Sequence, residues 1–180
     1  MINVLAARYA QVLFEVGEET QTTRGLYQEL SELVDILNEN KDLYNFLKSP
    51  LIGIEDKKNV MQNIFKNQLS NSMNNFLKVV IDKDRMSTIE YIKESYKSLL
   101  NDKNNILEGT AITAVELSEK EIKDLEKNLS IKYNKNVTLN NIVDETILGG
   151  VLVKLGNEEI DGTVRTRLSK MKNQLSQVIS

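Results

Sequence analysis

Residues 149–165 read GGVLVKLGNEEIDGTVR and lead directly into an amphipathic segment that extends to residue 180. The two glycines at the start allow a bend or a close backbone approach, and the apolar, β-branched residues after them predict a strand. Gly156-Asn157 predicts a hairpin turn, and Asp161-Gly162-Thr163 predicts the start of a helix. None of these residues is arranged for catalysis, so the stretch predicts an architectural element.

The sequence before this stretch completes a small α+β unit. Residues 110–115 alternate in character and carry β-branched side chains, which predicts a strand. Residues 118–121 form a capping box, Leu117 and Ile122 are spaced as a hydrophobic staple across it, and the helix that follows is expected to end near Tyr133. Further strands are predicted over residues 137–143, over residues 147–155 and through Ile160.

The first hundred residues predict one helix after another. Pro50 ends the third helix, because a proline disfavours helical geometry in the residue before it, and Ser87 with Glu90 predicts a capping box at the start of the sixth. The polar run 101–105 separates this region from the first strand. The predicted fold is therefore mainly α with two domains, a six-helix bundle over residues 1–105 and a small α+β domain over residues 106–180. The helices are expected around residues 2–16, 26–37, 42–47, 60–65, 73–80 and from residue 87 onward.

Composition excludes most catalytic chemistry. The chain contains no cysteine and no histidine, so it lacks the thiol nucleophile, the commonest general base and the commonest zinc ligand. No pair of carboxylates has the spacing of an acid/base site, and we expect no catalytic residue, no bound metal and no cofactor. A net charge of −3 argues against a nucleic-acid partner. No run approaches the roughly 18 apolar residues of a membrane span, and we expect no direct membrane insertion.

The first and fifth predicted helices carry wide apolar arcs. In the first, Arg8, Gln11 and Glu15 form a narrow polar strip, and nearly all the other positions are apolar. The fifth repeats this pattern over residues 71–82. Such helices are either centrally buried or offer a face to a partner. Both interpretations stay open, and the second predicts a groove for the amphipathic helix of another protein.

The last predicted helix also admits two interpretations. Its apolar residues recur at alternating steps of four and three, and no acidic residue follows residue 163. Packing against its own sheet explains such a stripe, and so does contact with an acidic helical partner. The stripe comprises Val164, Leu168, Met171, Leu175 and Val178, and its basic border comprises Arg165, Arg167, Lys170 and Lys172.

Motifs along the whole chain, taken in order, resemble one family, the delta subunits of F-type ATP synthase, whose mitochondrial counterpart is the oligomycin-sensitivity-conferring protein. Two positions depart from the family pattern: Thr163 stands where serine is commoner, and Asp84 stands where glycine usually precedes the arginine. The motifs are Ala7-Arg8-Tyr9-Ala10, Leu13-Phe14-Glu15, Phe46-Leu47-Lys48-Ser49-Pro50 with Lys57, Asn75-Phe76-Leu77 with Arg85, Leu117-Ser118, and Gly149-Gly150 through Asp161-Gly162-Thr163-Val164-Arg165 with Leu168.

The resemblance implies a non-catalytic stator subunit, present in one copy in the complex at the cytoplasmic face of the bacterial plasma membrane. Its helical domain holds N-terminal helices of alpha subunits, for which Tyr9, Val12 and Val79 are the expected groove residues. Its C-terminal domain joins the C-terminal region of the b subunit. On that side we expect contact or shaping roles for Gly149, Gly150, Arg165, Arg167, Lys170 and Lys172. The alternative function is a free-standing helical adaptor or regulatory protein.

Overall fold

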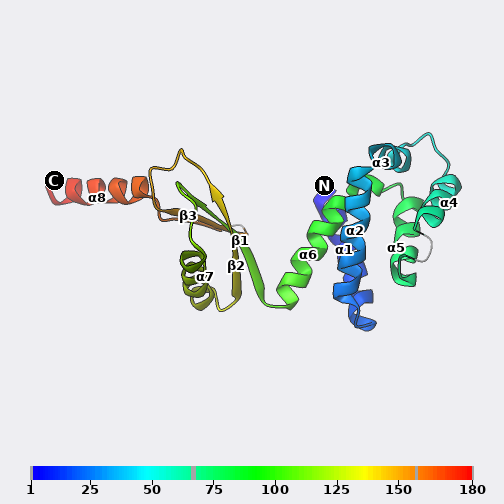
Figure 1. The fold of residues 1–180 in the computed structure, drawn as a ribbon, viewed down its shortest axis with the longest axis horizontal. Helices are drawn as coiled ribbons and strands as arrows, with labels where there is room; N and C mark the ends of the chain where they lie inside the picture. The colour runs from blue at the N-terminus through cyan, green and yellow to red at the C-terminus, as the bar shows by residue number, and fades with distance from the viewer. Residues whose placement is uncertain (1, 66–67, 157, 180) are drawn as a thin grey trace. The chain divides into compact units, whose positions relative to one another are not determined.

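The computed structural model describes residues 2–65, 68–156 and 158–179 (Figure 1). The chain forms two compact units, residues 1–100 and residues 101–180. It is mainly helical with one small sheet, as the sequence predicts. Within the described ranges, no helix is both long enough and apolar enough to cross a membrane.

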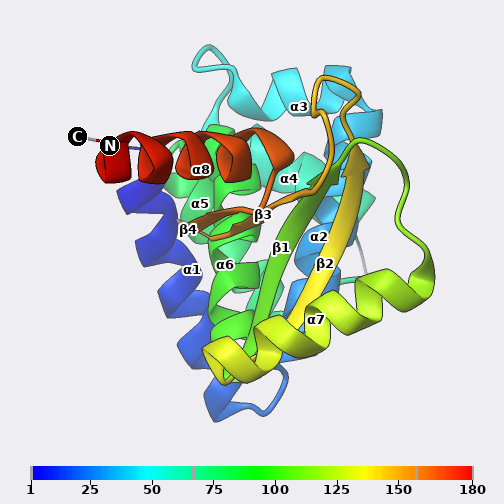
Figure 2. The ribbon, with the colours of Figure 1, turned by 90° about the vertical axis from the view of Figure 1, so that its left-hand side faces the viewer.

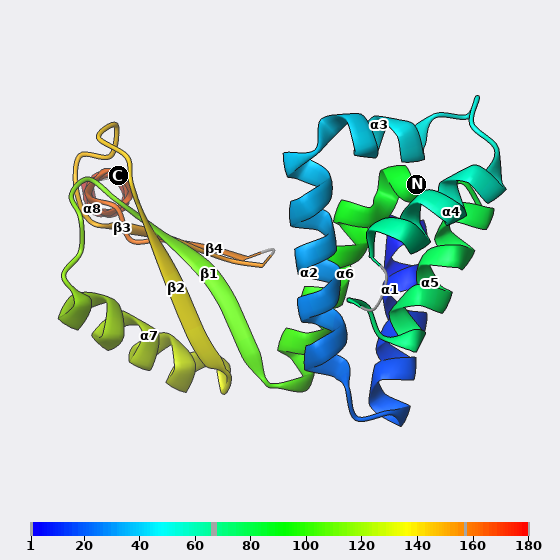
Figure 3. The same cartoon turned by 45° about the vertical axis from the view of Figure 1, so that its right-hand side comes forward.

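The first unit is helical throughout, and α1, α2 and α6 run side by side in it (Figure 3). Pro50 follows the third helix, which ends at Lys48 as predicted. The last helix of the unit continues to Lys103, and the polar run 101–105 therefore begins inside it. The helices are α1 (Ile2–Glu19), α2 (Thr23–Glu39), α3 (Lys41–Lys48), α4 (Ile54–Ile64), α5 (Asn71–Asp82), the short 3-10 turn η1 (Met86–Thr88) and α6 (Ile89–Lys103).

Aromatic side chains fix the centre of this core. Tyr96 of α6 is fully buried, and its hydroxyl donates a hydrogen bond of 3.0 Å to the carbonyl oxygen of Thr23. Phe14 meets the Tyr96 ring edge to face at 5.4 Å, and Tyr27 stacks on it at 6.2 Å. Because a buried hydroxyl without a partner costs about 1 to 3 kcal/mol, the hydrogen bond to Thr23 lets a tyrosine occupy an otherwise apolar core. The arrangement ties α1 and α2 to α6.

The predicted capping box at the start of α6 is wrong. Ser87 lies inside η1, and α6 begins two residues later, at Ile89. The hydroxyl of Thr88 donates to the carbonyl oxygen of Arg85 at 2.8 Å, which closes the short turn. A tight turn after α5 takes up the residues that the sequence pattern assigned to a helix cap.

The second unit is a four-stranded sheet in the order β2-β1-β3-β4. Strands β1 and β2 are parallel and are connected through α7, whereas β3 lies antiparallel to β1 and forms a hairpin with β4 (Figure 2). The elements are β1 (Ile106–Thr113), α7 (Glu119–Tyr133), β2 (Asn136–Val143), β3 (Val151–Leu155), β4 (Glu158–Asp161) and α8 (Val164–Ile179).

Helix α7 covers one face of this sheet. Leu129 of α7 is buried with Ala111, Val137 and Val153 from three strands. The predicted capping box of α7 is confirmed, because the Ser118 hydroxyl accepts from the backbone N–H of Glu121 while the Glu121 carboxylate accepts from Ser118. These hydrogen bonds lower the pKa of Glu121. Leu117 and Ile122, the predicted staple, both pack against the same core.

Two strand boundaries differ from the prediction. Strand β1 begins at Ile106 and ends at Thr113, which leaves Val115 outside the sheet and exposed. Strand β3 begins at Val151 because Gly149 and Gly150 have φ angles of +144° and +83°, which an extended strand does not tolerate. The hairpin register pairs Leu155 with Glu158, as the predicted Gly-Asn turn requires, although Asn157 lies outside the described residues.

Candidate partner-binding surfaces

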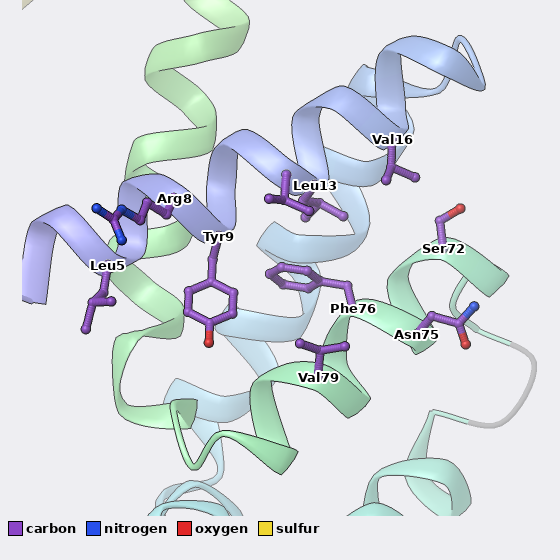
Figure 4. A pocket seen from close by; sticks show the side chains of 10 residues that line it. Leu5, Arg8, Tyr9, Leu13, Val16, Ser72, Asn75, Phe76 and Val79 are labelled. Carbon is purple, nitrogen blue, oxygen red and sulfur yellow. The ribbon is translucent and has the colours of Figure 1, made fainter.

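An apolar groove of about 570 Å³ lies between α1 and α5 in the first unit (Figure 4). The three predicted groove residues, Tyr9, Val12 and Val79, all line it. They come together from two helices that are more than fifty residues apart in the chain. The complete lining is Leu5, Arg8, Tyr9, Val12, Leu13, Val16, Ser72, Asn75, Phe76 and Val79.

Core packing on the opposite side of each helix creates this groove. Ala6 and Ala10 of α1 are fully buried, so the helix sits close to its neighbours and turns Val12 outward with 57 % of its surface exposed. Val80 of α5 is fully buried in the same way, and Val79 beside it is 47 % exposed. Central burial, the other interpretation of the wide apolar arcs, is therefore wrong for both valines. An exposed valine on each wall leaves apolar surface available to another molecule.

An aromatic pair joins the two walls of the groove. The rings of Tyr9 and Phe76 meet edge to face with their centroids 6.4 Å apart. Figure 4 shows Tyr9 pointing across from α1 toward Val79, with Phe76 between the helices. Since both rings pack against the main core, the floor of the groove is rigid, and its shape exists before any partner arrives.

Two ion pairs hold the end of α5 against α4. The ammonium group of Lys57 is 2.9 Å from the carboxylate of Asp84, and Lys57 is only 2 % exposed. Asp84 has a φ of +51°, a left-handed conformation that favours glycine. Lys58 pairs with Asp82 at 2.6 Å, and this hydrogen bond raises the pKa of Lys58. The sequence marked Lys57 only as part of a motif, because its partner lies 27 residues further along the chain.

The second surface is built around the start of α8. One carboxylate oxygen of Asp161 accepts from the backbone N–H of Thr163 at 2.9 Å, and the other accepts from the Thr166 hydroxyl at 2.7 Å. These bonds lower the pKa of Asp161, with the Thr166 hydroxyl as the largest cause. The backbone N–H of Val164 donates to the carbonyl oxygen of Gly149 at 2.9 Å. The predicted helix start is confirmed, and it is tied to the double-glycine bend.

Gly150 permits this junction by its lack of a side chain. A Cβ atom at this position would lie 2.5 Å from the carbonyl oxygen of Gly162 and 2.9 Å from the Cα of Thr163. Both contacts are with backbone, which cannot rotate away as the end of a side chain can. Gly149 and Gly150 therefore act by shaping the exit of α8 from the sheet.

The apolar stripe of α8 is uncovered along the part whose side chains are described. Leu168 and Met171 are 58 % and 59 % exposed, and Val164 is 39 % exposed. None of the three belongs to the buried cluster of the second unit. Packing of this stripe against its own sheet is therefore wrong for these positions, while the side chains of Leu175 and Val178 lie outside the described residues. The basic border is exposed as well, at Arg165, Arg167, Lys170 and Lys172.

Sequence reasoning missed three kinds of residue. Ser72 and Asn75 add a polar end to the groove, and only the i, i+3 spacing on α5 connects them. Arg8 lines the groove, although its place in the polar strip of α1 indicated only a solvent-facing edge. Leu148, just before the double glycine, is 74 % exposed. No group of three or more potential metal-ligating side chains lies close together among the residues placed by the structure.

An open apolar groove in the helical unit and an uncovered amphipathic helix in the α+β unit are surfaces of the kind that a subunit of a larger assembly presents. The family model described as ATP synthase delta (OSCP) subunit matches residues 5–175. The chain is 56 % identical to ATP synthase subunit delta of Clostridioides difficile (strain 630) over the full length of both chains. It is 41 % identical to ATP synthase subunit delta of Alkaliphilus metalliredigens (strain QYMF), covering 99 % of each.

The fold is also similar to that of a chain in the cryo-EM structure of the Toxoplasma gondii mitochondrial ATP synthase hexamer. The TM-score is 0.69 at 17 % identity, and the match covers 95 % of this chain and 97 % of that one. This likeness bears on the fold alone. The family model and the two close relatives show that the chain belongs to the ATP synthase delta (OSCP) family.

Proposed function

We propose that this chain is a non-catalytic peripheral-stalk subunit of an F-type ATP synthase. Residues 1–105 serve as its six-helix N-terminal domain and hold N-terminal helices of alpha subunits. Residues 106–180 serve as its C-terminal domain and join the C-terminal region of the b subunit. One copy links the catalytic head to the stalk at the cytoplasmic face of the bacterial plasma membrane. The link keeps the head from turning with the rotor, so that ion translocation stays coupled to ATP synthesis or hydrolysis.

The groove between α1 and α5 is the observation that carries the proposal. Its apolar positions on α1 run from Leu5 to Val16, a span of about 16 Å, which is the length of three helical turns. An amphipathic helix with apolar residues at steps of three and four fits a groove of this length.

A stator must also stay bound under torque. Nanomolar affinity, about 12 kcal/mol, is available to a helix that docks into a rigid apolar groove.

The proposal is tested by isothermal titration calorimetry of the full-length chain with a peptide of the alpha N-terminus. Val12→Asp and Val79→Asp should each weaken binding by about 2 kcal/mol or more, because the new carboxylate is desolvated without a partner. Val115→Asp is the matched control, since Val115 is 71 % exposed and lies in the other unit. Unchanged affinity in a folded Val12→Asp variant would show that the alpha helices do not bind in this groove.

A further inference from the structure

The groove carries a single charged side chain. Arg8 is exposed, and all the other lining residues are apolar, hydroxyl or amide side chains. Among the residues that the structure describes, Arg8 makes no ion pair with a carboxylate. An unpaired guanidinium on the wall of an apolar groove offers five donors in a planar fork that matches a carboxylate.

Charge is also distributed unevenly along the groove. Glu15 lies seven residues, or two helical turns, after Arg8, so both project from the same side of α1 at points about 10 Å apart. The side-chain amide of Gln11, between them, donates to the Glu15 carboxylate at 2.9 Å. At the far end of the groove, α5 supplies the uncharged Ser72 and Asn75 (Figure 4). One end of the groove is therefore positive and the other is neutral, and the Glu15 carboxylate lies outside the lining, on the same side of α1 as Arg8.

This distribution of charge argues against α8, whose apolar stripe is also uncovered, as the helix that binds in the groove. The border of α8 is entirely basic, with Arg165, Arg167, Lys170 and Lys172 exposed, and it would place like charge against Arg8. A helix with a carboxylate near Arg8 and without one near Glu15 has complementary charge. Such a helix binds in one direction only, because reversing it would place its carboxylate beside Glu15.

We propose that Arg8 fixes the direction of the helix held in the groove by pairing with a carboxylate at one end of that helix. The proposal rests on the proposed function for the identity of the occupant, the N-terminal helix of an alpha subunit. The apolar walls supply the affinity, and Arg8 supplies the orientation. The direction of the helix matters to a subunit that links two partners, because it decides from which end of the groove the rest of the alpha subunit continues.

The experiment is a charge-exchange cycle measured by titration calorimetry at low salt. The probe is a peptide of roughly the first 25 residues of the alpha subunit of the same complex, long enough to exceed the groove as a helix. Each carboxylate of the peptide is replaced in turn by lysine. Arg8→Glu should weaken the binding of the unmodified peptide about tenfold. One lysine-substituted peptide should bind the Arg8→Glu variant with most of the lost affinity restored. The same peptide should bind the natural chain more weakly than the unmodified peptide does.

A spin label reports the direction itself. A nitroxide at the peptide end that carries the compensated carboxylate should broaden the amide resonances around Leu5 more than those around Val16. Arg24→Glu is the matched control, since Arg24 is an exposed arginine on α2 outside the groove and its replacement changes the net charge equally. It should leave the affinity of every peptide within twofold of the natural value.

The outcomes separate the two proposals. If Val12→Asp abolishes binding but no peptide lysine compensates Arg8→Glu, the groove holds the alpha helix and the role of Arg8 is refuted. Equal weakening by Arg8→Glu and Arg24→Glu refutes it as well, because net charge is then the cause. If the natural chain does not bind the peptide at all, both the proposed function of the groove and the role of Arg8 fail.

Discussion

Helices α1 and α8 both leave apolar side chains exposed, but they do so in opposite settings. Helix α1 is anchored by fully buried Ala6 and Ala10, and its exposed Val12 faces a second wall that α5 supplies. Helix α8 is held at its first turn by Asp161, and beyond that turn its exposed Leu168 has no second wall among the described side chains.

The two surfaces are therefore expected to bind their partners in different ways. A groove with two walls and a rigid floor loses little conformational entropy when a partner docks, and its mostly apolar lining makes binding less sensitive to salt than binding at a basic surface. A single stripe with four basic side chains along it needs a partner to supply the other half of the interface. Binding there should depend on salt, because exposed charges are screened over about 8 to 10 Å.

The largest expected effect comes from removing α8. Deleting residues 167–180 keeps Asp161, Thr163 and Thr166, and so keeps the hydrogen bonds that close the end of the sheet. Because the described apolar residues of α8 lie outside the core of the second unit, we expect the sheet to remain folded. Binding of a b C-terminal segment should fall more than a hundredfold, while the alpha peptide binds unchanged. Retained b binding in calorimetry would place the b contact on the sheet.

The next effect tests the junction of α8 with the sheet. Gly150→Ala should destabilise the second unit by about 3 kcal/mol, through a clash with the backbone at Gly162 and a φ of +83° that alanine avoids. Gly156→Ala is the matched control, because Gly156 also has a positive φ, +56°, but has nothing within 4 Å of the added Cβ. It should cost about 1 kcal/mol. Equal losses in urea unfolding would show that strain alone, without the clash, governs Gly150.

A smaller effect concerns the support of the groove. Asp84→Asn should lower the free energy of unfolding by about 2 kcal/mol, because it leaves the buried Lys57 ammonium without its carboxylate. The loss is no larger because the Asp84 side chain is 54 % exposed and solvent screens the pair. Lys57→Met removes the buried charge along with the pair and should cost less. Asp84→Gly should recover about 1 kcal/mol relative to Asp84→Asn by relieving the left-handed backbone. A larger loss for Lys57→Met than for Asp84→Asn would contradict this account.

The smallest effect tests the basic border of α8. Reversing both Lys170 and Lys172 to glutamate should weaken b binding about tenfold at low salt and less at high salt, with little change in melting temperature. The control reverses Lys120 and Lys127, two exposed lysines of α7, and gives the same net charge. If both double variants bind b equally well across a salt series, the border is only a solvated face.

Local signals in the sequence predicted local structure well. The Ser118 capping box, the end of α3 before Pro50 and the start of α8 after Asp161 each depend on residues within a few positions of one another. The predicted start of β3 at residue 147 is wrong, because the apolar residues before Gly149 have the pattern of a strand and only the backbone angles of the two glycines end it. The cap at Ser87 failed because a 3-10 turn competes with it.

Only part of each candidate site can be predicted from the sequence. Hydrophobic periodicity shows which side of a helix is apolar, but not which neighbour covers it, so the pattern alone could not separate groove from core at Val12 or stripe from core at Leu168. The pairing of Lys57 with Asp84 depends on a turn that brings distant residues together, and no local pattern encodes it. The position of Arg8 on the groove wall depends on α5 in the same way.

We propose that one chain holds two partners at separate surfaces at the same time. The direct measurement is a calorimetric titration of the full-length chain with the alpha peptide, first alone and then after saturation with a soluble b C-terminal segment. We expect one alpha peptide per chain in both titrations, with affinities that agree within twofold. Loss of alpha binding in the presence of b, or displacement of b by the alpha peptide, would contradict it.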